Sequence, residues 1–300
     1  MNQEPLPKVP KDEGDEDSRS VIYIEYESQI KRLVRNLVDL PADSPSIYLD
    51  ASGIGNNILD HLHLFILPTN TLYLVDLIRL GDAAFSTVGN GEMSLRLVLE
   101  SKSIPKVGFD IRDVSRLLFR QHNISLAGIF DVQLMELASR TKGHSMKFLA
   151  GLAKCIDRDI SNSNDRKIRW LNPAQPSNLY VHNTVGHAPK WVMRRVEMFP
   201  VLWSFYKQKL DRPKKAMWLH LARQESEQRV QEAKRNAGSY PERQHWGPEV
   251  FWDGEQRKAA IDAWNDGKLL DKSLGELNFV TTNGISREVM NRIGSSATEF

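Results

Sequence analysis

The sequence contains a single cysteine and no apolar run long enough to cross a bilayer. One cysteine excludes an internal disulfide framework and a cysteine-rich zinc site, and a spanning helix needs about 20 consecutive apolar residues. The first 20 residues also lack the apolar core of a signal peptide. We therefore expect an intracellular protein, nuclear or cytoplasmic, with no membrane partner.

An excess of charge of one sign is also absent, because 40 Lys and Arg stand against 38 Asp and Glu. This balance excludes a polyanion mimic and a strongly basic nucleic-acid binder. The charges are unevenly distributed, however. Residues 1–27 carry eight acids against three bases, and residues 190–235 carry twelve bases against five acids. The basic segment is either a solvated helix face or a surface for an anionic partner.

The apolar pattern predicts an α/β fold. Residues 1–20 are rich in Pro, Ser and acids and are predicted to be disordered, and a helical stripe follows over 27–40. Three strands are predicted at 46–50, 62–68 and 71–77, the last two at hairpin spacing. Strands and helices then alternate, which favours antiparallel strands followed by βαβ units in a mixed sheet. Helices are expected again after residue 190.

The stretch KVGFDIRDVSRLLFRQHNISLAGIFDVQLMELASR, together with the strand order, resembles the RNase D and Werner-type DEDD 3′–5′ exonuclease domains, in particular those common in fungal proteins. The resemblance covers about residues 21–210. It implies an RNase H-like mixed five-stranded sheet flanked by helices. With the composition, it divides the chain into a disordered acidic tail (1–20), an exonuclease-like domain (21–210) and a helical C-terminal extension (211–300).

The resemblance implies two-metal phosphodiester hydrolysis with Mg²⁺ or Mn²⁺. Hard cations need carboxylate oxygens, and four acids supply them in this family. Two form an Asp-x-Glu at the end of the first strand. The third lies on the helix that follows the fourth strand, and the last belongs to a Tyr-x-x-x-Asp spacing on a late helix.

Three of these four acids are replaced in this chain. The strand acid matches Asp50, but the Glu position is Ser52. Aligning FDIR and LLF puts the helix acid at Val114, and aligning FPVLW puts the last Tyr and Asp at Trp191 and Arg195. We therefore expect no working catalytic residues and no metal or other cofactor. We also predict that Arg195 forms an ion pair with Asp50 where the metal ions would lie.

Other acids leave an active site open as an alternative. Asp110, Asp113 and Asp131 could join Asp50 in a rearranged site that uses Mg²⁺ or Mn²⁺. Their structural interpretation is simpler. Asp110 is expected to be the N-cap of the next helix, with Asp113 as its capping partner, and Asp131 to bind main-chain groups at a strand end.

Three functions are consistent with these residues. The one we favour is a catalytically inactive nucleic-acid-binding or adaptor module that holds single-stranded RNA or DNA through Arg112, Arg116, Lys190, Trp191, Arg194 and Arg195. The second is the active exonuclease with a rearranged site. The third is a protein-interaction scaffold whose apolar anchors are Trp218, Trp246, Phe251, Trp252 and Trp264 in the C-terminal extension.

Overall fold

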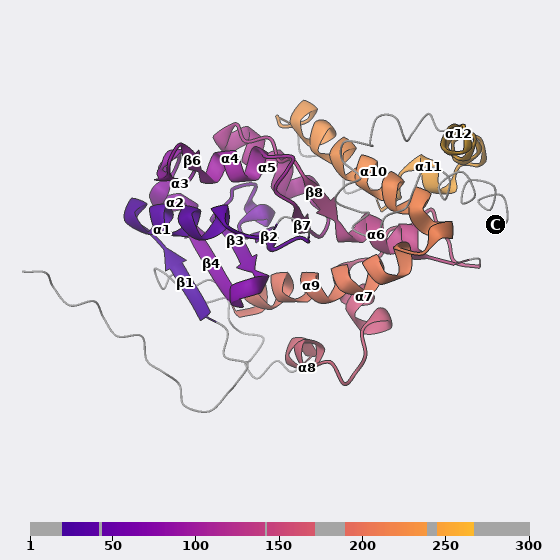
Figure 1. The fold of residues 1–300 in the computed structure, drawn as a ribbon, viewed down its shortest axis with the longest axis horizontal. Coiled ribbons are helices and arrows are strands. Elements are labelled where there is room, and N and C mark those ends of the chain that lie inside the picture. The colour runs from indigo at the N-terminus through magenta and orange to yellow at the C-terminus, as the bar shows by residue number, and fades with distance from the viewer. Residues whose placement is uncertain (1–19, 42–43, 142, 172–189, 239–244, 267–300) are drawn as a thin grey trace, which may run out of the picture.

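The computed structural model describes residues 20–41, 44–141, 143–171, 190–238 and 245–266. The predicted disordered tail therefore lies outside the described residues except for Ser20, which begins a strand. A mixed sheet of six strands in the order β1-β4-β3-β2-β7-β8 forms the centre of the fold (Figure 1). The strands are β1 (Ser20–Ile24), β2 (Ile47–Ala51), β3 (His61–Ile66), β4 (Thr71–Asp76), β7 (Lys106–Gly108) and β8 (Ile129–Asp131). Strands β5 (Val88–Asn90) and β6 (Met93–Ser94) form a separate pair.

The predicted mixed α/β sheet is confirmed. Strands β2, β3 and β4 are antiparallel neighbours, and β7 and β8 follow parallel to β2. The predicted number of five strands is wrong by one, because β1 pairs parallel with β4 from Ser20 to Ile24. This edge strand is short and directly follows the acidic segment, so its five residues gave no separate strand signal.

Helices cover both faces of the sheet. One face is covered by α1 (Glu27–Val38), α2 (Leu77–Leu80), α3 (Ala83–Ser86), α4 (Leu95–Glu100) and α5 (Arg112–His122). The other face is covered by α6 (Val132–Ser139), α7 (Leu152–Asp159), α8 (Asp165–Leu171) and α9 (Lys190–Leu210). The alternation along β2 fits these two layers, because Ile47 and Leu49 join the first cluster and Tyr48 joins the second.

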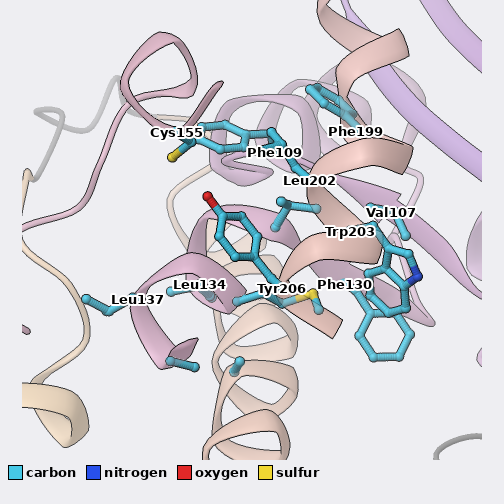
Figure 2. Close-up of a cluster of buried hydrophobic side chains, with 14 of the residues drawn as sticks. Val107, Phe109, Phe130, Leu134, Leu137, Cys155, Phe199, Leu202, Trp203 and Tyr206 are labelled. Atoms are coloured by element: carbon cyan, nitrogen blue, oxygen red, sulfur yellow. The ribbon is translucent and has the colours of Figure 1, made fainter. Parts of the chain in front are cut away.

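Aromatic contacts fix α9 against the sheet (Figure 2). Phe199 of α9 stacks on Phe109, with 6.2 Å between ring centroids, and Trp203 meets Phe130 edge-on at 5.0 Å. Both partners follow or belong to the parallel strands β7 and β8. A helix residue one turn before Phe199 is therefore held close to the ends of these strands, and that residue is Arg195.

The C-terminal helices are α10 (Ala216–Arg235), α11 (Glu249–Trp252) and α12 (Gly254–Asn265), preceded by the short η3 (Pro213–Lys215). Helix α10 packs against α5, α6 and β8. Met217, Phe251 and Trp264 belong to the same apolar cluster as Tyr48 of the sheet. None of the described helices combines the length and the hydropathy needed to cross a membrane.

Candidate functional site

The parallel strands β2, β7 and β8 bring acidic residues to one edge of the sheet. Asp50 is the next-to-last residue of β2, Asp110 follows β7, and Asp131 ends β8. Neighbouring strands lie about 4.8 Å apart, so the carboxyl ends of three adjacent strands gather these acids within a short distance. Ligand sites of α/β sheets lie outside such carboxyl ends, and this edge is the candidate functional site.

The predicted ion pair between Asp50 and Arg195 is present. Nε of Arg195 lies 2.8 Å from Oδ2 of Asp50. The Asp50 side chain is 4% exposed and that of Arg195 is 33% exposed. Burial raises the pKa of Asp50, and the Arg195 charge opposes that shift. Of the Arg195 nitrogens, Nε is the one that donates a hydrogen bond to a described residue, and the two Nη groups carry four further N–H donors.

A buried histidine lies beside the Asp50–Arg195 pair on the same face of the sheet. His63 of β3 stands directly opposite Asp50 in the antiparallel ladder, which puts both side chains on the same face. Neither ring nitrogen has a hydrogen-bond partner among the described residues. Burial lowers the pKa of His63 to about 3, and the charges of His61 and Arg195 act in the same direction. His63 is therefore a neutral imidazole at neutral pH, beside a charged pair.

Two further positions of the expected acidic set carry no carboxylate. Ser52 follows β2, and its hydroxyl is buried with no hydrogen-bond partner among the described residues. Val114 is buried in the apolar cluster on the opposite face with Leu117 and Leu118. The Trp191 position lies in α9, but its side chain is outside the described residues.

Asp131 is committed to the main chain, as predicted. Its carboxylate caps α6 by accepting from the Gln133 amide at 3.0 Å. It also accepts from the amides of Asp110 and Ile111, at 2.8 and 3.0 Å. A guanidinium completes its shell, because Nη1 of Arg229 on α10 donates to Oδ2. Asp131 thus joins the ends of β7 and β8 to α6 and to the C-terminal helix.

The predicted N-cap role of Asp110 is wrong. Ile111 is the N-cap of α5 and makes no side-chain cap bond, while Asp110 itself has a φ of 53°. The left-handed backbone turns the Asp110 carboxylate toward Arg112, whose Nε and Nη2 donate to it at 2.6 and 2.7 Å. Asp113 instead lies 3.4 Å from Nη2 of Arg116, one turn along α5.

These acids do not fit a pair of divalent cations. Asp50, Asp110 and Asp131 each lie against an arginine. In the described ranges, no three His, Cys, Asp or Glu side chains are grouped so that they could hold a metal ion. A guanidinium about 4 Å from a unit positive charge also costs about 4 kcal/mol at an effective dielectric constant of about 20. The donor set is that of ion pairs and not of a two-metal centre.

The predicted basic residues are not all gathered in one place. Arg116 is 1% exposed and donates to Oδ1 of Asn57 at 2.8 Å, so its charge does not face a passing strand. Arg112 is half-buried against Asp110. Arg194 is half-buried and next to Arg195 on α9, whereas the Lys190 side chain lies outside the described residues.

No protein-family model and no curated protein matches this chain. Solved structures do match. The structure of RNase D from Trypanosoma brucei in complex with RNA U12 is 15% identical, with a TM-score of 0.55 and 78% of each chain covered. The structure of Trypanosoma brucei RNase D without a named ligand is 15% identical, with a TM-score of 0.50, and covers 72% of this chain and 73% of that one. The chain has the RNase D-like 3′–5′ exonuclease fold.

Within this RNase D-like fold, sequence reasoning found Asp50 and Arg195 and missed His63 and Arg229. His63 could have been found from the hairpin pattern, because alternate residues of β3 share a face with alternate residues of β2. Arg229 gave no local signal, since it lies 98 positions from Asp131. Identity of 15% shows a common fold, so the chemistry of the site must be argued from its own residues.

Proposed function

We propose that this chain is an intracellular, catalytically inactive exonuclease-fold protein that binds single-stranded nucleic acid along the sheet edge beside α9. The observation that carries the proposal is the 2.8 Å contact between Arg195 and Asp50. In the register that the resemblance implies, Arg195 occupies the position of the last of the four acids. Asp50 is therefore neutralised from within the chain and not by Mg²⁺ or Mn²⁺.

The same replacement favours an anionic ligand. Removing carboxylates at Ser52, Val114 and Arg195 removes their repulsion of phosphates, and the two Nη groups of Arg195 are suited to phosphate oxygens. Arg194 adds a second guanidinium on the same turn of α9. That the Trypanosoma brucei RNase D structure is a complex with RNA U12 supports a nucleic-acid ligand for this fold.

The two alternatives have less support. An active, rearranged site would require Asp50, Asp110 and Asp131 to leave their arginines and converge on metal ions. A scaffold built on C-terminal aromatics loses most of its anchors, because Trp218, Phe251 and Trp264 are buried in the core. Trp252 is partly buried, and of the five predicted anchors only Trp246, at 53% exposure, stands at the surface.

The test combines cleavage with binding. The full chain is incubated with end-labelled single-stranded RNA and DNA in Mg²⁺ or Mn²⁺, and affinity is measured by fluorescence anisotropy over a range of salt concentrations. We expect no trimming, and an affinity that falls as salt rises. Arg195→Gln should weaken binding about tenfold and reduce the salt slope by about 1. Asp50→Asn should keep or strengthen binding, because it removes a negative charge.

Arg32→Gln is the matched control, since Arg32 is an exposed arginine of α1 on the other side of the sheet. It should leave affinity unchanged. Manganese-dependent shortening of the 3′ end that Asp50→Asn abolishes would refute the inactive state. An affinity below detection at low salt, or one that Arg195→Gln leaves untouched, would refute binding at this edge.

A further inference from the structure

A cavity of about 370 Å³ lies between α10, α11 and the start of α5. Its volume falls within the range of small-ligand sites, which begins at roughly 300 Å³. Residues of α10 that are three or four positions apart share a helix face, and one such face lines the cavity with Glu225, Gln228, Arg229 and Glu232. Trp246 and Trp252 contribute aromatic rings to the lining. Acidic and aromatic side chains therefore meet in one enclosed space.

The acids of this cavity are the carboxylates of Glu225, Glu232 and Glu249. Glutamine side chains of α10 and α12 donate hydrogen bonds to Glu232 and Glu249. Among the described residues, however, no salt bridge reaches any of the three carboxylates. Glu225 is half-buried. Burial raises the pKa of Glu225, the charge of Glu232 acts in the same direction, and Arg229 opposes the shift. Glu225 is thus a partly desolvated carboxylate beside a second acid.

The two guanidinium groups that line the cavity bind carboxylates of the sheet edge. Nη1 of Arg229 donates to Asp131 and lies 3.8 Å from Asp110. Arg112 donates to Asp110 through Nε and Nη2. The attraction of Arg229 for Glu225 is therefore shared with two further acids. Since both cations already have carboxylate partners, the glutamates leave the cavity with an excess of negative charge, and this excess favours a cationic ligand.

The tryptophans of the cavity already hold one cation of the chain. Nζ of Lys147 lies 4.1 Å from the ring centroid of Trp246 and 4.8 Å from that of Trp252. The indole N–H of Trp252 donates to the main-chain oxygen of Gly247 at 2.8 Å, which fixes that ring. Trp246 is 53% exposed, and Phe148, which stands opposite it in a β-bridge, is 51% exposed. An exposed aromatic pair thus borders the acidic cavity.

We propose that this cavity binds an arginine side chain of a protein partner, whose neighbouring apolar residues pack on Trp246 and Phe148. A guanidinium is planar, stacks on aromatic rings and carries five N–H donors that suit carboxylates, and the cavity offers both kinds of group. Charge complementarity selects this partner over a nucleic acid, because phosphates would be repelled by the three glutamates. The inference goes beyond the proposed function, since Asp50 and Arg195 are not among the residues that line the cavity.

The experiment compares two short peptides that differ by one charge. The probes are acetyl-Leu-Arg-Leu-amide and the same peptide with citrulline, a neutral isostere of arginine. Each is titrated into the full chain up to about 10 mM, and binding is followed by NMR through the indole N–H signals of Trp246 and Trp252. We expect the arginine peptide to shift both signals to saturation, because both rings line the cavity. The citrulline peptide should bind about tenfold more weakly, since it brings no charge to the glutamates.

Matched variants locate the effect in the cavity. Glu225→Gln/Glu232→Gln removes two of its charges and should weaken binding of the arginine peptide about tenfold. Glu27→Gln/Glu92→Gln removes two exposed acids, one on α1 and one between β5 and β6, and should leave the affinity unchanged. Arg195→Gln should also leave it unchanged, which separates this inference from the proposed function.

The inference is overturned if the indole signals stay unshifted at the highest concentration of the arginine peptide. Equal binding of the citrulline peptide, or equal binding by the Glu225→Gln/Glu232→Gln variant, overturns it too, because the recognition would then not depend on charge. Indole shifts given by single-stranded RNA and not by the arginine peptide would assign the two rings to a nucleic acid and would also overturn it.

Discussion

The ion pair between Asp50 and Arg195 predicts a measurable coupling between two side chains 145 positions apart. We consider Asp50→Asn, Arg195→Gln and the double variant. Two unit charges about 4 Å apart interact by about 4 kcal/mol at an effective dielectric constant of about 20. Since one third of the Arg195 side chain is exposed, screening by water reduces this to about 2 kcal/mol.

Arg195→Gln alone should cost about 3 kcal/mol of unfolding free energy, because it leaves a buried carboxylate without its cation. Burial then raises the Asp50 pKa further, because only the backbone hydrogen bond from Ala51 still opposes the shift. A carboxyl whose pKa is higher in the folded chain contributes stability below its unfolded pKa and loses it as pH rises through the folded value. The variant should therefore regain stability relative to the wild type as the pH falls from 7 to 5.

Urea unfolding at pH 7 and pH 5 on all four proteins measures both effects. The double variant should be more stable than the sum of the single changes allows, by about 2 kcal/mol. Additivity within about 0.5 kcal/mol would mean that the contact contributes nothing to the folded state. A pH-independent Arg195→Gln penalty would mean that Asp50 is not the group left uncompensated.

Three further predictions concern neighbouring residues. Because His63 has a pKa of about 3 in the fold, the unfolded chain binds more protons than the folded chain below pH 6.5. The stability of the folded chain therefore decreases as the pH is lowered below 6.5. The advantage of His63→Leu in urea unfolding should grow by about 2 kcal/mol from pH 7 to pH 5, and a constant difference contradicts this assignment. Arg229→Met leaves Asp131 buried and should cost about 3 kcal/mol, with a smaller loss in Arg229→Met/Asp131→Asn. Gly53→Ala should lower Tm by several degrees, since φ is +84° and a Cβ would lie 2.2 Å from the Ile58 oxygen, whereas Gly55→Ala has open space and should not.

Much of the fold follows from local patterns. Strands β2, β3 and β4, the hairpin between β3 and β4 and the first helix were predicted to within about two residues, because their apolar spacing is regular. Strand β1 was missed because its pairing with β4 is decided by contacts 50 residues away and not by its own sequence. Asp110 was misassigned for a related reason. Its left-handed backbone is set by Asp131, which holds the Asp110 amide from the next strand.

The candidate site also has residues that the sequence predicted and residues that it did not. Asp50 and Arg195 could be paired from sequence because the resemblance supplied a register for two distant segments. The pairing of Arg229 with Asp131 had no such register, since α10 lies outside the stretch that the resemblance covers. Burial of Arg116 was equally invisible, because a basic residue in a helical pattern is expected at the surface. Charge alone therefore overestimated the residues available to a nucleic acid.

The pairing of Arg195 with Asp50 also bears on how the acidic set could be restored. Restoring the acidic set that the resemblance implies would take Ser52→Glu, Val114→Asp and Arg195→Asp. Arg195→Asp alone would place two carboxylates against each other, and Val114→Asp alone would put a charge into the apolar cluster under α5. Either change alone is expected to give a protein less stable than the present one. The present side chains at this edge therefore oppose a stepwise return to that acidic set.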